Sequence, residues 1–276
     1  MSCSRNVAIR RCYMKHPRRL KFLRRTSVED EGPTLRAPCD SRGLAAARYP
    51  ARSAKGVGFV HESRLPDLTA RLIAVGEANY GTYSWQRTHD AYTVFVAEYF
   101  LRRSNRTTVE RYLPAFLERF PDAASLASTE PDVVLERASW AGMRTRTMHL
   151  PAAVAAFVAL DRPTAAALEE IPHVGPYAAS AIALYAFGEP VFPVDGNVKR
   201  VVSRWLDLAD GAELLAATRA IATEAQKVGG PSSVMHAHFG ALTIGWTNCR
   251  TRRRCDGCRL SSSCMSSSTS THDGGT

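Results

Sequence analysis

The chain has 276 residues, 45% of them hydrophobic, so it is long enough to bury a substantial core in one or two domains. Its net charge of +10 is uneven: residues 1–65 hold 15 Lys and Arg against 5 Asp and Glu, while the other residues hold 21 of each. Because the body of the chain is formally neutral, it must bind any polyanion through local basic patches. No apolar run approaches the ~20 residues of a membrane-spanning helix, so no membrane partner is predicted.

Both ends of the chain have the composition of disordered segments. Residues 1–64 are rich in Arg, Ser, Gly and Pro, which predicts a basic, mostly disordered arm. A transit peptide, or an over-long extension with Met14 as the true start, are the alternatives. The Ser-rich segment 265–276 is a predicted disordered tail. No secretion signal is recognised, and the crowded cysteines favour a reducing location, cytoplasmic (at the nucleoid) or nuclear.

From Leu65 onward the apolar residues recur with helical spacing, and no convincing alternating strand occurs. A helix beginning at Asp90 as its N-cap is followed by one capped by Thr107 or Thr108. The predicted helices cover 65–78, 90–103, the segment after 107, 123–128, 130–138, 145–160, 164–170, 177–187, 197–206, 211–227 and 231–246. The pattern predicts an all-α fold of two helical lobes with a cleft between them. One lobe covers about 90–200, the other covers 65–89 and 201–248, and a loop at 249–264 follows.

The segment 171–200 contains the most informative motif. It opens with the turn IPHVG, continues as an Ala-rich helix and stops at Gly188-Glu189-Pro190. A carboxylate, Asp195, then precedes the helix that begins GNVKR. A helix that starts directly after a tight turn presents backbone N–H groups to solvent, which suits a phosphate.

Four cysteines form the second motif, with the spacing C-x5-C-x2-C-x5-C. They are Cys249, Cys255, Cys258 and Cys264. Four thiols within sixteen residues are too close and too regular for an ordinary disulfide framework, so they predict a metal centre. Thiolates in this number suit a [4Fe–4S] cluster, and a zinc ion is the alternative.

Together, in this order, the two motifs resemble those of the helix-hairpin-helix base-excision DNA glycosylases. The resemblance covers roughly 65–264. It implies a monomeric enzyme that hydrolyses N-glycosidic bonds in double-stranded DNA and carries a [4Fe–4S] cluster. Two features depart from the family pattern: His173 replaces a glycine of the hairpin, and the first cysteine gap is five residues instead of six.

The resemblance assigns catalytic roles to two carboxylates. Asp195 matches the family's essential aspartate, whose charge stabilises the oxocarbenium-like sugar as the base leaves. The local alternative is an N-cap for the following helix. Glu98 matches a glutamate that protonates the departing base or positions water. The alternative for Glu98 is a salt bridge to Arg102, four residues later on the same helix.

Tyr177 stands where the bifunctional members carry a lysine that forms a Schiff base. Because tyrosine cannot form an imine, the resemblance implies a monofunctional glycosylase that uses water. A packed aromatic is the equally simple alternative. Arg102 and Arg103 resemble the arginine pair of mismatch-thymine glycosylases and suit guanine edges. A solvated helix end explains them as well.

Further residues are predicted to contact DNA from the hairpin, from the helix after Asp195 and from the loop 249–264 that carries the four cysteines, called the cysteine loop below. The full predicted DNA-contacting set is Arg102, Arg103, His173, Val174, Gly175, Lys199, Arg200, Arg252, Arg253 and Arg254. The favoured substrate is thymine or uracil opposite guanine. The alternatives are adenine opposite 8-oxoguanine or guanine, and, in another class, a non-catalytic protein that binds DNA structures.

Overall fold

The computed structural model describes residues 62–88, 90–209 and 211–267, so nearly all of the predicted arm and most of the predicted tail lie outside the described residues. Within these ranges the regular elements are helices and no strand occurs, which confirms the all-α class. The α-helices are α2 (Leu65–Asn79), α3 (Ala91–Leu101), α4 (Arg106–Arg119), α5 (Ala123–Ala127), α6 (Pro131–Arg137), α7 (Arg144–Met148), α8 (Leu150–Val158), α9 (Ala165–Glu169), α10 (Pro176–Phe187), α11 (Gly196–Leu206) and α12 (Gly211–Thr247).

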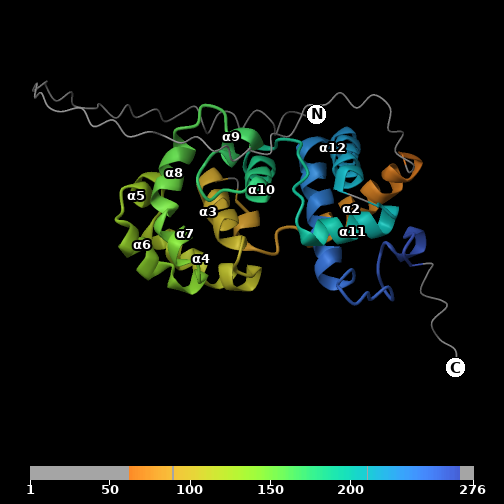
Figure 1. Ribbon diagram of the computed structural model, residues 1–276, viewed down its shortest axis with the longest axis horizontal. Helices are drawn as coiled ribbons and strands as arrows, with labels where there is room; N and C mark the ends of the chain where they lie inside the picture. Colours follow the sequence, from red (N-terminus) through yellow and green to blue (C-terminus); the bar gives the residue numbers. More distant parts are fainter. Residues whose placement is uncertain (1–61, 89, 210, 268–276) are drawn as a thin grey trace, which may run out of the picture. The chain divides into compact units, whose positions relative to one another are not determined.

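The helices bury two hydrophobic cores, and the helices that build them are labelled in Figure 1. Helices α3 to α6 and α8 to α10 build the first core, which is rich in aromatic side chains such as Phe95 and Phe100. Helices α2, α11 and α12 build the second core, which contains the fully buried Trp205. Helix α10 belongs to both, because Ala183 lies in the first core and Leu184 in the second. The exact boundaries of the two predicted lobes stay a prediction.

Side-chain caps fix where α3 and α4 begin. As predicted, the carboxylate of Asp90 accepts a hydrogen bond from the Thr93 N–H at 2.9 Å and caps α3. The predicted cap of α4 at Thr107 or Thr108 is wrong, because Asn105 accepts from the Thr108 N–H at 2.8 Å. Asparagine is a stronger N-cap than threonine, so α4 begins earlier, at Arg106.

Proline and glycine modify two of the predicted helices. The predicted helix at 145–160 is divided into α7 and α8, because Pro151 has no N–H to donate to the carbonyl one turn earlier. The predicted helices at 211–227 and 231–246 form the two halves of α12, which is kinked at Gly229 and Gly230. Gly230 has a φ of 67°, a left-handed conformation that glycine adopts without strain. Within the described ranges, no helix combines the length and the apolar character that crossing a bilayer requires.

Two glycines bring α2 and α12 into backbone contact. A Cβ added to Gly76 would lie 1.9 Å from the carbonyl oxygen of His236. One added to Gly240 would lie 2.0 Å from the carbonyl oxygen of Leu72. Both contacts are with backbone atoms, so no side-chain movement can relieve them.

We expect Gly240→Ala to lower the free energy of unfolding by about 1–3 kcal/mol or more, because the two helices must separate to admit the methyl group. Gly211→Ala is the matched control, since Gly211 lies in the same helix with no atom within 4 Å of its added Cβ. Urea unfolding followed by circular dichroism measures both variants. Equal midpoints for the two would contradict the close approach of α2 and α12.

Candidate active site

A cavity of about 400 Å³ is lined by residues of both cores. Its walls come from α3, α4, α10, the start of α11, α12 and the segment 80–86. Ten of the eighteen lining side chains are aromatic or aliphatic and eight are polar or charged, a mixture that suits a nucleobase, which has apolar faces and polar edges. Glu98, Tyr177 and Asp195 all line this cavity, so the fold brings the three predicted catalytic residues together.

Glu98 lies in the middle of α3 and is only 4% exposed. Its Oε2 is buried and has no hydrogen-bond partner among the described residues. Burial, and then the negative charge of Asp195, raise the pKa of Glu98 to about 8. The alternative of a salt bridge to Arg102 is wrong, since no ion pair joins the two side chains in the described part of the chain. Glu98 is therefore a neutral carboxylic acid at pH 7, with a proton to donate.

Asp195 caps α11 and faces the cavity at the same time. Its Oδ1 accepts hydrogen bonds from the backbone N–H groups of Asn197 and Val198, both at 2.8 Å. Its Oδ2 accepts from the side-chain amide of Asn197 at 2.5 Å. The capping interpretation is thus correct, and it coexists with a position in the cavity wall. These hydrogen bonds hold a negative charge in a fixed orientation near Glu98.

Tyr177 lies in the first turn of α10, beside the two carboxyl groups. Burial, and then the charges of Glu98 and Asp195, raise the pKa of Tyr177 well above its ordinary value. Its neighbour His238 is fully buried, and burial lowers the pKa of His238 to about 3. A 2.5 Å hydrogen bond joins Nδ1 of His238 to the hydroxyl of Tyr185. This wall of the cavity is therefore aromatic and uncharged at neutral pH.

The turn before α10 has the geometry of a tight hairpin in spite of its histidine. His173 has a φ of 69°, the left-handed conformation in which the family pattern has a glycine. Its ring stacks on His149 with centroids 4.5 Å apart. Val174 is buried, and a Cβ added to Gly175 would lie 2.7 Å from Nη1 of Arg102. Glycine at 175 therefore leaves room for the Arg102 guanidinium beside the hairpin.

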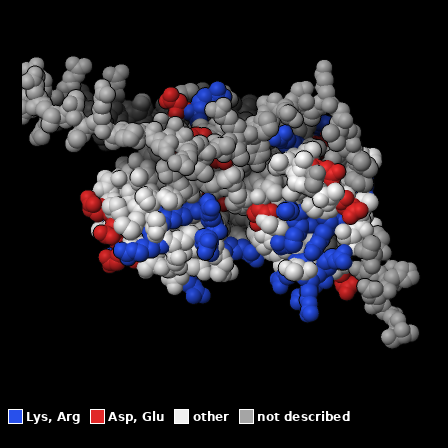
Figure 2. All heavy atoms as spheres, in the orientation of Figure 1, with Lys and Arg blue, Asp and Glu red and all other residues white. Residues whose placement is uncertain are grey.

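Basic side chains gather in two groups on one face (Figure 2). One group lies over α4 to α7, and the other lies over α11 and the cysteine loop. A second cavity, also of about 400 Å³, lies beside the hairpin and is lined by Arg102, Arg103, Arg144, Arg146 and His173. Arg146 is buried over the Tyr99 ring at 4.1 Å, and its Nε and Nη2 have no partner among the described residues. Sequence reasoning missed Arg144 and Arg146, although the RTR sequence opens α7.

The two residues of α11 that are predicted to contact phosphate differ in whether their side chains are held by hydrogen bonds within the protein. Lys199 is exposed. The guanidinium of Arg200 donates to the Gly196 carbonyl at 2.8 Å, to the Asn197 side chain at 2.6 Å and to the Cys249 carbonyl at 3.2 Å. Arg200 thus braces the start of α11 against the cysteine loop.

All four predicted cysteine ligands line one small cavity, with Trp205 and Leu260 in its walls. Burial, followed by the charges of the neighbouring thiols, raises the pKa values of Cys258 and Cys264. Within the described ranges, no set of His, Cys, Asp or Glu side chains is arranged to hold a single metal ion. The three arginines of this loop that are predicted to contact DNA are all exposed: Arg252, Arg253 and Arg254.

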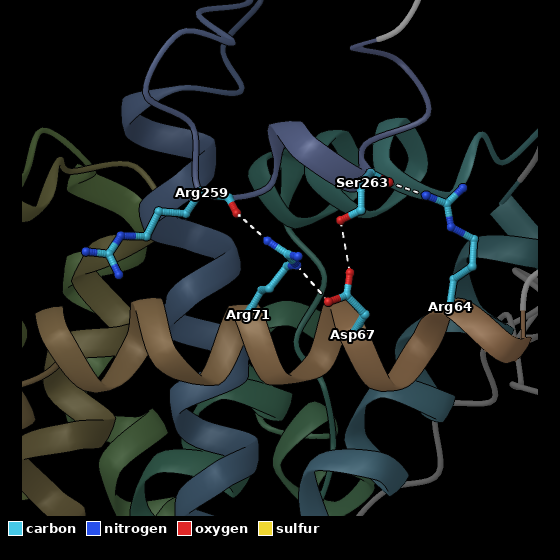
Figure 3. Close-up of polar contacts among 5 residues, drawn as sticks. All are labelled: Arg64, Asp67, Arg71, Arg259 and Ser263. Carbon is cyan, nitrogen blue, oxygen red and sulfur yellow. Dashed lines mark hydrogen bonds and ion pairs between the residues drawn. The ribbon is translucent and has the colours of Figure 1, made fainter.

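Helix α2 holds the far end of the cysteine loop (Figure 3). Asp67 accepts from the Ser263 hydroxyl at 2.9 Å and from Arg71 at 2.8 Å. Arg71 also donates to the Arg259 carbonyl at 3.2 Å, and Arg64 donates to the Ser263 carbonyl. The cysteine loop is therefore fixed to the second core at both of its ends.

Several lining residues of the active-site cavity were missed by sequence reasoning. They include Tyr80, Asn197, Arg106, Tyr185, Phe239 and Trp246. Asn197 follows Asp195 by two residues, and this spacing is the one local signal that identifies any of them.

Comparison with known proteins finds similarity to DNA glycosylases. No family model matches the chain. A thymine-DNA glycosylase of Aeropyrum pernix is 26% identical over 220 residues, which cover 75% of this chain and 97% of that protein. An adenine DNA glycosylase of Mycolicibacterium smegmatis is 31% identical over 188 residues, 64% of this chain and 62% of that protein. The human adenine DNA glycosylase is 28% identical, and the match spans only 33% of it.

Solved structures of the same class share the fold. The structure of a thermostable thymine-DNA glycosylase superimposes with a TM-score of 0.66 at 18% identity, over 75% of this chain and 98% of that one. An endonuclease III trapped as a covalent complex with DNA superimposes with a TM-score of 0.60 at 15% identity, over 74% and 97% of the two chains.

Proposed function

We propose that the chain is a monofunctional DNA N-glycosylase of the helix-hairpin-helix superfamily, and its similarity to thymine-DNA and adenine DNA glycosylases supports this proposal. It would remove a mismatched or damaged base from double-stranded DNA after the base has been extruded into the cavity of about 400 Å³. The observation that carries this proposal is the presence of Glu98 and Asp195 in the wall of one cavity, where burial raises the pKa of Glu98 to about 8.

The two carboxyl groups divide the reaction between them. Glu98 donates its proton to the departing base, which takes the electron pair of the C1′–N bond. Asp195 stabilises the positive charge that develops on the deoxyribose. A water molecule then adds to C1′, and the proton that it loses restores the acid form of Glu98. The products are a free base and an abasic site.

Tyr177 supports hydrolysis without strand cleavage. It lines the cavity beside both carboxyl groups, where an amine would form a Schiff base with C1′. A neutral phenol cannot form this imine, so water remains as the nucleophile.

For the substrate, we infer thymine or uracil opposite guanine. The near-complete coverage of the Aeropyrum thymine-DNA glycosylase and the arginine pair at 102 and 103 support this choice. The runner-up is adenine opposite 8-oxoguanine or guanine, which the 31% identity to an adenine DNA glycosylase supports. The arginines beside the hairpin and in the cysteine loop would bind the DNA backbone and the unpaired partner base.

Three duplexes separate these options: G·T, G·U, and A opposite 8-oxoguanine. We expect alkali-labile abasic sites to form faster on G·T or G·U than on the adenine duplex, and borohydride to trap no covalent complex. Faster release of adenine would establish the runner-up. Tight binding with no product on any duplex would instead establish a DNA-structure-binding protein, and a trapped complex would refute the monofunctional assignment.

For the four cysteines we propose a [4Fe–4S] cluster, with a zinc ion as the alternative. Their thiols surround one cavity with an apolar back wall, and both ends of the loop are held by hydrogen bonds. Cys249, Cys255, Cys258 and Cys264 would hold the group, which would supply rigidity to the basic loop and no step of the hydrolysis.

Purified protein is expected to contain about four iron and four sulfide per chain and to show broad visible absorption. Cys258→Ser should remove the iron–sulfur content and the visible absorption, and it should lower the thermal midpoint of unfolding. Cys39→Ser, at a cysteine outside the described residues, is the matched control and should change neither. One zinc ion per chain with no visible absorption would establish the alternative.

A further inference from the structure

Arg106 and Trp246 form a cation–π pair in the wall of the cavity that contains Glu98 and Asp195. The guanidinium of Arg106, the first residue of α4, lies 3.8 Å from the centroid of the Trp246 ring near the end of α12. Both residues line the cavity that holds Glu98 and Asp195. The pair therefore joins the two sides of the pocket in which the base would sit.

The Arg106 side chain is held in place without using its hydrogen-bond donors. Among the described residues, the guanidinium has no carboxylate or carbonyl partner. The contact that orients it is the stacking on the indole ring of Trp246. A guanidinium stacked on an aromatic ring is oriented through its flat face, so its N–H groups remain free around its edge. These donors line the cavity, so they are available to a ligand that brings an acceptor into it.

The structure assigns Arg106 a role toward the base itself. We propose that Arg106 donates hydrogen bonds to the carbonyl oxygens of the extruded base and stabilises the negative charge that these oxygens gain as the base leaves. The preferred substrate class is then a pyrimidine with ring carbonyl groups, such as thymine or uracil. This inference rests on the proposed glycosylase function and names the chemistry that its pocket favours.

The reaction chemistry shows why a cation is useful there. When the C1′–N1 bond breaks, its electron pair stays on the pyrimidine and is delocalised over N1 and the carbonyl oxygens. The oxygen of a water molecule forms the new bond to C1′ and releases one proton, and the base gains one proton in total. A guanidinium beside the carbonyl oxygens stabilises the transient charge more than it stabilises the neutral base, so it lowers the barrier.

The same donors disfavour adenine. Adenine presents an exocyclic amino group, which is itself a donor, where thymine and uracil present a carbonyl oxygen. Donors that face donors make no hydrogen bond with each other, and such a mismatch costs affinity and rate.

Single-turnover rates on a series of leaving bases test this role. The duplexes carry 5-fluorouracil, uracil or thymine opposite guanine, three bases of decreasing N1 acidity. We expect Arg106→Gln to slow thymine release by roughly 10²-fold and 5-fluorouracil release much less, because the most acidic base needs the least help. Arg106→Lys keeps the charge but not the planar fork and should give intermediate rates.

Arg111→Gln is the matched control. Arg111 is exposed on the same helix and outside the cavity, so its substitution removes an equal charge and should leave all three rates unchanged. Equal slowing of all three bases by Arg106→Gln would show a merely structural contact with Trp246 and overturn the inference, as would unchanged rates. If wild-type protein releases no base from any duplex, the proposed function itself fails, which is a different outcome.

Discussion

Asp195→Asn is expected to abolish base release while leaving the fold and DNA binding intact. The single-turnover rate should fall by ~10³-fold or more, because a fixed charge beside the developing sugar cation is lost. Asparagine is as good an N-cap as aspartate, so the amide oxygen can still accept the two 2.8 Å hydrogen bonds from Asn197 and Val198. The effect should therefore appear in the chemical step and not in the thermal midpoint.

Asp90→Asn is the control for this substitution. Asp90 also caps a helix through its side chain, but it is exposed and does not line the cavity. Its substitution should leave base release unchanged. Loss of DNA binding in Asp195→Asn, or a retained rate, would contradict the role of Asp195 as the charge that stabilises the sugar.

Glu98→Gln is expected to slow base release by ~10²–10⁴-fold and to remove a pH dependence. Glu98 must carry its proton in order to donate it, and its pKa is raised to about 8. The kcat/KM of the wild-type protein should therefore be high below pH 8 and fall above it, while the residual rate of the variant should not follow this curve. A wild-type profile that rises through pH 8 would show that Glu98 acts as a base.

The same raised pKa has a consequence for stability. The ordinary carboxyl value is 4.5, so the unfolded chain loses this proton at a lower pH than the folded protein does. Folding stability contributed by the protonated Glu98 is present below about pH 4.5 and is lost as the pH rises towards 8. In this window, wild-type protein should lose about 1.4 kcal/mol per pH unit relative to Glu98→Gln. Urea unfolding of both proteins at pH 6 and pH 7.5 measures the difference, and parallel pH dependences would mean that Glu98 is ionised in the folded state.

Local features of the sequence determine much of the fold. The cap at Asp90 and the breaks at glycine and proline are local events, and they allow the helix positions to be predicted. The error at Thr107 or Thr108 is also local, since Asn105 is a competing cap two residues earlier. The backbone contact between Gly76 and Gly240 has no local signal, because it depends on how two distant helices pack.

The candidate site also contains residues that a local motif predicts and contacts that only the tertiary structure reveals. Asp195 and Tyr177 lie within one recognisable motif and could be predicted from it. The alternative salt bridge between Glu98 and Arg102 assumed a regular helix, but α3 ends at Leu101 and the Arg102 guanidinium lies beside Gly175. The pairing of Arg106 with Trp246 joins helices that are far apart in the sequence, so only the tertiary structure reveals it.

Mass spectrometry of the free nucleobase is the most direct measurement of the central claim. Wild-type protein is incubated in excess over a G·T or G·U duplex, and released base and abasic sites are both quantified. We predict one free pyrimidine for each abasic site and no strand cleavage before alkali is added. Stable duplex binding without any released base, on these duplexes and on adenine opposite 8-oxoguanine, would contradict the account.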